Sequence, residues 1–500
     1  MYTLEIPLKV KYNQNRYLAK VFFYKFKIKS VLINWCNKNL KALQNTWKYK
    51  NLIQQYRKET DKKRKRKISN ELNKLVDKYH LNRKDIYKFL NEQHKKYKKY
   101  FNSFEINAIG DETLHGLEQI LYIYGEQLKY KSLYNSRTIA TKILRGGGIN
   151  LINNDKVLIG RIYKPSSNII CKLNIDPKNL YIQECLLEDS DKIKYCRLKR
   201  RQFPNYYHYY IQLIIDSKPP NKLKIKDGTS GIDIGTQTVA VVNDNKCILT
   251  ELAMKTDEYN KQIQKLQRKL DKSRQETNKD LYDKDGTVKK GSKGKFKKSK
   301  NYIKLQRQLR TIYRKKSEYT RQEHNKLVNE IMQMSKQGVY IEPMNYRALA
   351  KKSKSKIQKS NNIRIIKGKK VQLYKKKRRF GKSINNKSPG LFINILKYKC
   401  EFNNIPYYEI DRTSFKASQY NHLTDTYIKK DLNQRWNILG KDKIQRDLYS
   451  AFLIKNSNSE LTKPDRLKCI EEFNNFKKLH NKEIKRLVNS NNKKLNSFGF

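Results

Sequence analysis

The sequence lacks paired cysteines and long apolar runs, and each shortage argues against a class of protein. Its seven cysteines are scattered, and no two form a Cys-x-x-Cys pair. This pattern argues for a reducing compartment and against a cysteine-based zinc site. No apolar run approaches the ~20 residues of a membrane-spanning helix, and the first residues carry no signal-peptide pattern. We therefore expect a cytosolic protein, or a nuclear one if its host has a nucleus, without a membrane partner.

Acidic residues are also scarce. The chain has 46 Asp and Glu against 112 Lys and Arg, a formal net charge of +66. A compact body with this excess repels itself unless a polyanion neutralises it. Nucleic acid is the obvious polyanion, and its binding should weaken steeply as salt rises. The alternative is a surface made basic for solubility or by an AT-rich genome, but genome bias explains the choice of lysine over arginine and not the missing Glu. We expect a protein of the bacterial cytosol that associates with the nucleoid.

The length of 500 residues predicts about two to four domains. Residues 2–10 alternate like a strand, and from about residue 15 to residue 99 apolar residues recur near the helical period. Short runs bounded by turn residues then indicate a small β-barrel or sheet. These strand-like runs are 156–163, 169–175, 180–185, 194–199 and 206–216.

Two stretches have the composition of a nucleic-acid contact. Tyr206–Tyr210 lies close in sequence to Arg197–Arg201. Interleaved aromatic and basic residues on a sheet suit stacking on bases and pairing with phosphates, although they also suit an ordinary barrel core. Residues 347–382 hold sixteen Lys and Arg and no Asp or Glu, and we expect a polyanion to order this segment. The candidate contacts are Arg197, Arg200, Arg201, Lys375, Lys376, Lys377, Arg378 and Arg379.

The segment Gly231–Val242 predicts a buried strand, a tight turn at Gly235 and a second strand that returns beside the first. Asp233 lies on the first strand among apolar residues. An ionised carboxylate is costly there unless a cation or a hydrogen-bond network compensates it. Two interpretations stay open at this point. Asp233 accepts hydrogen bonds from backbone N–H groups of the turn, or it is a metal ligand or the acid of a phosphate site.

Two further acids occur at comparable places. Glu342 ends a short strand that Pro343 stops, and Asp447 lies near the start of an amphipathic helix, 444–454. A ribonuclease H-like sheet carries acids in this order and brings them to one edge. Three close carboxylates repel each other unless divalent cations neutralise them. Two Mg²⁺ or Mn²⁺ ions about 3.5–4 Å apart can activate a water and stabilise the leaving oxygen. Taken singly, Glu342 could be a surface strand end and Asp447 a helix-dipole acid.

Three motifs carry a resemblance to a known family. Gly231–Gly235, Tyr340–Asn345 and Gln445–Ala451 resemble the three RuvC motifs of the TnpB family of transposon-encoded, RNA-guided DNA endonucleases, relatives of the type V CRISPR effectors. The specific similarity covers roughly residues 195–455. It implies a metal-dependent nuclease with Asp233, Glu342 and Asp447 as catalytic and metal-binding residues. It also implies two partners, a guide RNA and a double-stranded target DNA of which one strand is displaced.

The resemblance also implies a fold class and an order of parts. The expected fold combines an α/β ribonuclease H-like (RuvC) nuclease domain with an all-β barrel that carries an all-α insertion. The expected parts are a first barrel (wedge-like) strand, 1–14; a helical recognition domain, 15–140; the rest of the barrel, 141–220; the first nuclease part, 221–345; a basic segment, 346–390; the second nuclease part, 391–456, with a substrate-loading loop, 412–443; and a basic helical tail, 457–500.

The chain departs from the family in the substrate-loading loop. The family usually has a four-cysteine zinc ribbon there, whereas residues 413–422 contain no cysteine and one histidine, His422. We expect no structural zinc and a loop held by packing, with Tyr420, Tyr427 and Trp436 as candidates. Arg435 is a candidate contact to the scissile strand, with a surface salt bridge as the alternative. In the third motif, Tyr449 replaces a commonly seen Asn.

Other functions compete with this interpretation. The segment Gly231–Thr238 also resembles the first phosphate loop of actin-like sugar kinases, which would need a second such loop. Asp285-Gly286-Thr287 is the available candidate, and it lies in a lysine-rich insert. A guide-directed DNA-binding repressor with weak nuclease activity and a non-catalytic RNA-binding protein are the further alternatives. The guide, the adjacent DNA motif and the oligomeric state are not predicted.

Overall fold

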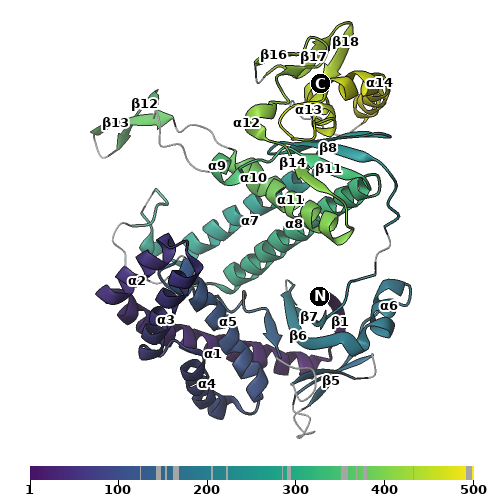
Figure 1. Ribbon diagram of the computed structural model, residues 1–500. Helices are drawn as coiled ribbons and strands as arrows, with labels where there is room; N and C mark the ends of the chain where they lie inside the picture. Colours follow the sequence, from purple (N-terminus) through teal and green to yellow (C-terminus); the bar gives the residue numbers. More distant parts are fainter. Residues whose placement is uncertain are drawn as a thin grey trace. The chain divides into compact units, whose positions relative to one another are not determined.

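The computed structural model divides the chain into two compact units, Met1–Asn221 and Lys222–Phe500, drawn in Figure 1. Each unit is treated by itself below. The structure describes residues 1–123, 125–141, 148–152, 155–160, 168–203, 206–220, 223–283, 285–289, 294, 296–350, 358–366, 369–375, 380–431, 433–490 and 498–499, with the backbone alone for 358–366 and 369–375.

The first unit contains a helical part that follows its first strand. The helices are α1 (Tyr12–Asn45), α2 (Trp47–Lys58), α3 (Lys62–Lys78), α4 (Arg83–Tyr97) and α5 (Ser103–Glu118), with a π-helical turn over Gln119–Ile123. Buried apolar residues such as Leu18, Phe22 and Leu32 recur along α1 at helical spacing. Thr46 and Asn102 cap α2 and α5 through their side-chain oxygens. The helical pattern predicted for this region is confirmed.

The first unit also contains an antiparallel seven-stranded sheet in the order β2-β6-β7-β1-β5-β4-β3. Its core includes Ile6, Ile211 and Ile215, all fully buried. The first strand pairs with β7 and β5, and β3 lies near β6, so the sheet curls into a barrel-like form. The strands are β1 (Tyr2–Lys9), β2 (Thr138–Ala140), β3 (Ile149–Ile152), β4 (Lys156–Ile159), β5 (Ile169–Leu173), β6 (Ile193–Gln202) and β7 (Tyr207–Ile215).

One predicted strand of the barrel is wrong. Residues 180–185 belong to a helix, α6 (Leu180–Glu188), followed by a 3₁₀ turn at Ser190–Lys192. The Asn179 side chain accepts a hydrogen bond from the Ile182 N–H and caps this helix. Consecutive burial of Cys185 and Leu186 does not follow the alternation of a strand. A short apolar run cannot be assigned by pattern alone, and here the cap favours the helix.

The second unit is built on a five-stranded sheet in the order β10-β9-β8-β11-β14. The strands β8 (Thr229–Ile234), β9 (Thr238–Asn243) and β10 (Cys247–Glu251) form an antiparallel meander. The strands β11 (Gly338–Ile341) and β14 (Tyr407–Glu409) run parallel to β8. The predicted hairpin, the third strand and the two later strands are therefore present, and β8 is central.

Helices cover both faces of this sheet (Figure 1). Ile232, Ile234 and Val241 pack with α8 (Lys300–Met332) and α11 (Pro389–Phe402) on one face. Ala240 and Val242 pack on the other face with α13 (Arg446–Lys455) and α14 (Arg466–Val488). Because successive side chains of a strand point to opposite faces, Asp233 belongs to the face that α13 covers.

The remaining elements of the second unit are short, apart from α7 (Thr256–Thr277), which ends shortly before a 3₁₀ turn, Lys279–Leu281. The basic segment contains a two-stranded antiparallel hairpin that the sequence analysis did not predict. The helix predicted from residue 444 begins at Arg446, because Ile444 and Gln445 end a strand. The short elements are α9 (Tyr346–Ala350), β12 (Gln358–Ile366), β13 (Lys369–Lys375), α10 (Gly381–Lys387), α12 (Arg412–Phe415), β15 (Tyr420–Asn421), β16 (Thr426–Tyr427), β17 (Trp436–Leu439) and β18 (Asp442–Gln445). Of the helices in the described part of the chain, none has both the length and the apolarity that crossing a bilayer requires.

Candidate active site

Asp233 and Glu342 are brought together by the pairing of β8 with β11. The two strands are parallel, and Ile232 lies opposite Ile341. The Glu342 N–H donates to the Ile232 carbonyl at 3.4 Å, so the register continues for one more residue. Glu342 therefore lies beside Asp233, where both parallel strands reach their carboxyl ends.

Asp447 reaches the same place through the packing of α13. A Cβ atom on Gly231 would lie 2.2 Å from the Ala451 carbonyl oxygen and 2.4 Å from the Lys455 nitrogen, so the helix rests on bare strand backbone. Asp233 follows Gly231 by two strand residues, about 6.6 Å, and Asp447 precedes Ala451 by four helical residues, about 6 Å. The distance from Gly231 to Asp233 along the strand is therefore similar to the distance from Ala451 to Asp447 along the helix. The close approach of Gly231 to Ala451 thus places Asp447 near Asp233.

The pKa values of the three acids reflect this arrangement. Burial raises the pKa of Asp233 well above its ordinary value, and the neighbouring Asp447 and Glu342 carboxylates raise it further. Burial also raises the pKa of Asp447 and of Glu342. All three side chains stay half-buried, which leaves a path from solvent.

Three arginines surround the three carboxylates. The positive charges of Arg446 and Arg435 offset part of the increase in the pKa of Asp447. Arg446 also offsets part of the increase in the pKa of Asp233. Arg412 Nε lies 3.8 Å from Glu342 Oε1 and lowers its pKa. The sequence analysis named only Arg435 of these. Sequence position could have indicated the other two, because Arg446 directly precedes Asp447 and Arg412 begins the segment 412–443.

The donor chemistry of the three acids fits Mg²⁺ or Mn²⁺. Carboxylate oxygens are the hard ligands that these ions prefer, and a cation would relieve the mutual repulsion that raises the pKa of Asp233. Among the described residues, no three His, Cys, Asp or Glu side chains already stand in a metal-holding arrangement. The three acids are nevertheless close enough for Asp447 and Glu342 to raise the pKa of Asp233.

The three barrel arginines named from the sequence differ in exposure. Cys196, Leu198 and Arg200 of β6 point inward, and Arg197 and Arg201 lie on the outer, half-buried face. Arg200 is 3% exposed, lies over the rings of Phe22 and Tyr207, and donates to the Leu133 carbonyl. Its guanidinium is therefore not available to a phosphate, which corrects the expectation for Arg200. Arg197 lies over the Tyr195 ring and donates to its hydroxyl, and Arg201 lies over Tyr210 and pairs with Glu5.

The candidate contacts of the basic segment are not tested. Lys375 ends β13, of which only the backbone is described. Lys376, Lys377, Arg378 and Arg379 lie outside the described residues. Arg435 precedes β17, and its carbonyl accepts from the Arg446 N–H at 2.9 Å, which places it next to the acids. Within the described chain it has no ion pair, so the contact to a scissile strand stays a prediction.

The segment 412–443, expected from the sequence to load the substrate, is held by aromatic packing. The Tyr420 and Tyr427 rings lie 4.9 Å apart, and Trp436 donates to the Gly499 carbonyl. His422 is fully buried, its Nδ1 lies 2.8 Å from the Tyr449 hydroxyl, and its ring packs on Phe473. Burial, with Arg466 nearby, lowers the pKa of His422 to about 4. Tyr449, the departure noted in the third motif, is thus the hydrogen-bond partner of the loop histidine.

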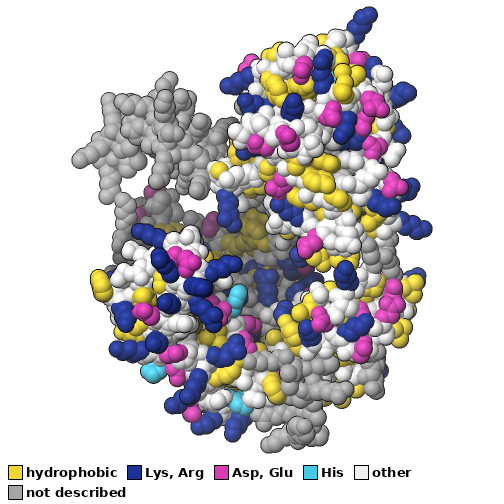
Figure 2. All heavy atoms as spheres, viewed as in Figure 1, with side chains coloured by type: hydrophobic (Ala, Val, Ile, Leu, Met, Phe, Trp, Pro, Cys, Tyr) yellow, Lys and Arg dark blue, Asp and Glu magenta, His cyan; other side chains and the backbone are white. Residues whose placement is uncertain are grey.

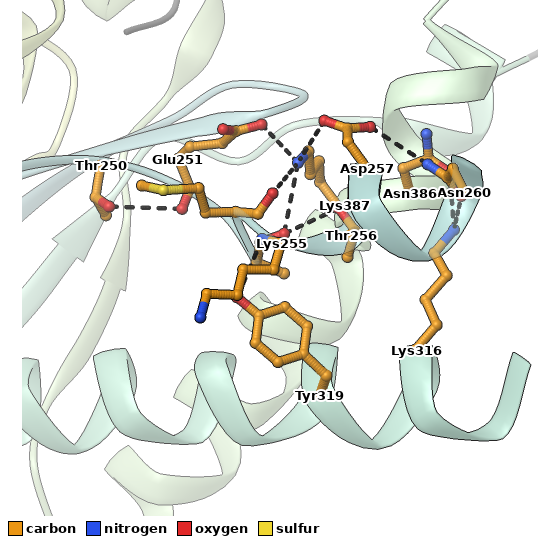
Figure 3. Close-up of polar contacts among 12 residues, drawn as sticks. Thr250, Glu251, Lys255, Thr256, Asp257, Asn260, Lys316, Tyr319, Asn386 and Lys387 are labelled. Atoms are coloured by element: carbon orange, nitrogen blue, oxygen red, sulfur yellow. Dashed lines mark hydrogen bonds and ion pairs between the residues drawn. The ribbon is translucent and has the colours of Figure 1, made fainter. Parts of the chain in front are cut away.

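The sequence analysis also missed a buried lysine in the second unit. Lys387, at the end of α10, is 2% exposed; its Nζ lies 2.5 Å from Glu251 Oε1 and 3.5 Å from Asp257 Oδ2 (Figure 3). Nearby, Lys316 Nζ donates to Asn260 and Asn386 at 2.8 and 2.9 Å. These contacts join α10, which lies near the end of the basic segment, to β10, α7 and α8. Nothing in the sequence distinguishes Lys387 from the other lysines of the basic segment, so its burial could not be predicted.

Comparisons with known proteins give a structural likeness. No protein-family description and no curated protein matches the chain. The cryo-EM structure of a Cas12f1–sgRNA–target DNA complex shares 12% identity with a TM-score of 0.45, covering 87% of this chain and 82% of that one. A cryo-EM structure of a CRISPR-Cas12f ternary complex shares 12% identity with a TM-score of 0.25, covering 87% and 81%.

Proposed function

We propose that this chain is an RNA-guided DNA endonuclease that hydrolyses phosphodiester bonds with Mg²⁺ held by Asp233, Glu342 and Asp447. The observation that carries the proposal is the convergence of the three acids, two at the ends of neighbouring parallel strands and one on the helix that covers them. The strand order, an antiparallel meander followed by two parallel strands, supports a ribonuclease H-like domain. The three motifs support the TnpB-like assignment.

The residues of the site would act by holding and orienting. Asp233 is held by a central strand and Glu342 by the strand beside it, so the separation of their backbones is set by the sheet. Asp447 is carried by a helix that packs directly on β8. Bound Mg²⁺ would supply the activated water and the stabilisation of the leaving oxygen. Arg412, Arg435 and Arg446 would orient the phosphate chain, because each is close enough to alter a carboxylate pKa.

The proposed partners are a guide RNA and a target DNA. The net charge of +66 calls for a polyanion, and Lys and Arg side chains are spread over the visible face of each unit (Figure 2). In a guided enzyme, base pairing with the RNA reads the sequence, and the protein contacts backbones by charge and shape. A positively charged surface suits that division of tasks.

The test begins with RNA that copurifies with the full-length protein. That RNA is sequenced, and duplex DNA complementary to its variable end, flanked by randomised sequence, is incubated with the complex and Mg²⁺. We expect cleavage next to a short motif. Asp233→Ala, Glu342→Ala and Asp447→Ala should each abolish cleavage and keep the RNA. Asp227→Ala is the matched control, because that acid is 73% exposed in the same unit. Wild-type cleavage by Asp233→Ala would overturn the proposal, and sugar-dependent ATP hydrolysis by RNA-free protein would favour the kinase.

One observation favours a second candidate, a guide-directed DNA-binding protein with weak nuclease activity. The described residues hold no three acidic, histidine or cysteine side chains already arranged around a metal position. In that case the complex would bind its target and cut slowly. Target binding with a cleavage rate unchanged by Asp233→Ala would select this candidate over the nuclease.

A further inference from the structure

Tyr346 connects the end of β11 to the turn behind Asp233. It begins α9, four residues after Glu342, and its hydroxyl donates to the Gly235 carbonyl at 3.3 Å. Gly235 lies two residues after Asp233, in a turn closed by a hydrogen bond from its N–H to the Thr238 carbonyl at 2.9 Å. The turn is therefore tied on one side to its own strand and on the other side to Tyr346.

The surroundings keep this phenol neutral and in place. Burial raises the pKa of Tyr346, and the Asp233 and Glu342 carboxylates raise it further, so the hydroxyl keeps its proton at neutral pH. The ring also lies beside Gly390 at the start of α11, where an added Cβ would be 3.9 Å from Tyr346 Cδ2. A half-buried ring with contacts on two sides fixes the direction of its hydroxyl.

Tyr346 holds the end of β8, the strand that carries Asp233. The orientation of this strand end affects the direction of the Asp233 carboxylate. Asp233 lies beside Glu342 through the pairing of β8 with β11, and on the face of β8 that α13 covers. A carboxylate at a strand end, followed by a glycine turn, rotates and shifts with that turn. The hydrogen bond from Tyr346, which follows Glu342, to the Gly235 carbonyl therefore links the end of β11 to the end of β8.

We propose that Tyr346 is a positioning residue that sets the direction of Asp233 toward Glu342 and Asp447, and through it the affinity of the site for divalent cations. This inference rests on the proposed function. The alternative is that the ring packs and the hydroxyl contributes nothing. Tyr346→Phe separates the two, because it keeps the ring and removes only the donor.

The experiment measures cation binding without chemistry as well as cutting. Ca²⁺ is titrated into the RNA-bound protein by calorimetry, and the Mg²⁺ midpoint of cleavage is measured on the same preparations. One hydrogen bond contributes roughly 0.5–1.5 kcal/mol, so Tyr346→Phe should weaken both by about twofold to tenfold. The matched control is Tyr408→Phe, because that side chain stacks on Tyr340 and is 37% exposed. It should leave both midpoints unchanged.

Each result of these measurements supports or overturns the role proposed for Tyr346. Wild-type midpoints in Tyr346→Phe would overturn it, and so would a variant that loses its fold, because the hydroxyl would then have a structural role. Asp233→Ala in parallel separates the two proposals. If that variant loses Ca²⁺ binding and cleavage while Tyr346→Phe behaves like wild type, the role of Tyr346 fails alone. If Asp233→Ala itself binds Ca²⁺ and cuts normally, the proposed function fails.

Discussion

Gly231 on β8 and Ala451 on α13 approach so closely that a single added carbon on the glycine would lie 2.2 Å from the Ala451 carbonyl oxygen. This contact brings a strand acid and a helix acid together, although 214 residues separate them in sequence (447 minus 233). Gly231, the first of the two glycines in this motif, is therefore required for helix packing, whereas Gly235 lies in the turn.

Gly231→Ala should displace α13 and with it Asp447. Overpacking of this kind costs about 1–3 kcal/mol, and we expect a lower melting temperature together with loss of cleavage. Gly381→Ala is the control, because an added Cβ there meets only an ordinary 3.8 Å contact with the Ala350 carbonyl oxygen. Retention of wild-type activity in Gly231→Ala would show that the close packing does not position Asp447.

Asp233→Asn should stabilise the protein in EDTA. Burial and the two neighbouring acids raise the pKa of Asp233 in the folded state, so the folded protein holds this proton more tightly than the unfolded chain. Stability therefore falls as pH rises from about 4, the unfolded value, through the raised pKa, and the cost persists at neutral pH. The Asn variant lacks this cost. Thermal melts across pH, with and without Mg²⁺, should show a gain in EDTA and no stabilisation by Mg²⁺ in the variant.

His422→Gln should flatten the acid limb of stability. Burial lowers the pKa of His422 to about 4, below the ordinary value of about 6.5. The folded state then binds fewer protons than the unfolded state, so wild-type stability falls as pH drops from about 6.5 to 4, by about 3 kcal/mol in total. Burial also lowers the pKa of His324 and His480, and these should keep part of the slope in the variant. An unchanged slope in urea melts would contradict the burial of His422.

Lys387→Met should destabilise the second unit strongly. It would leave Glu251, whose side chain is 7% exposed, without its ammonium partner (Figure 3). Removing one partner of a buried ion pair costs about 3–5 kcal/mol. Lys336→Met is the control, since its pair with Asp227 is 63% and 73% exposed and is expected to contribute about 1 kcal/mol or less. The double variant Lys387→Met/Glu251→Gln should recover part of the loss in chemical unfolding.

Arg197→Ala and Arg200→Ala should behave differently although they are close in sequence. Arg197 lies on the outer face of the barrel sheet, and its loss should reduce the slope of log affinity for RNA against log salt by about 1. Arg200 is buried between two rings and a carbonyl, so its loss should lower the melting temperature with little change in that slope. Equal salt slopes for the two variants would contradict this division.

Local pattern was sufficient for several parts of the chain. Alternation in residues 2–9, helical spacing along α1 and the apolar hairpin around Asp233 each predict an element whose face is set by its own sequence. The carboxylates could be named because the type and order of their elements are local properties. The lack of a cysteine pair and the excess of lysine are likewise properties of composition alone.

Tertiary structure decided which of the chemically similar basic residues are exposed and which are buried. Arg200 points inward and Arg201 outward because β6 is fixed in register against β7, and a one-residue shift would exchange them. Lys387 is a buried ion-pair partner only because α10 meets β10 and α7. By contrast, the helix α6 has a local signal, the Asn179 cap, which the strand prediction overlooked.

The sequence by itself determined the charge, the type of most elements and the three acids to be tested, because each follows from residues close together in the chain. The folded chain alone decided that a helix rests on Gly231, that Tyr346 reaches the turn behind Asp233, and that Tyr449 meets His422. These contacts join segments far apart in sequence, and their distances are set by how the sheet and its covering helices pack.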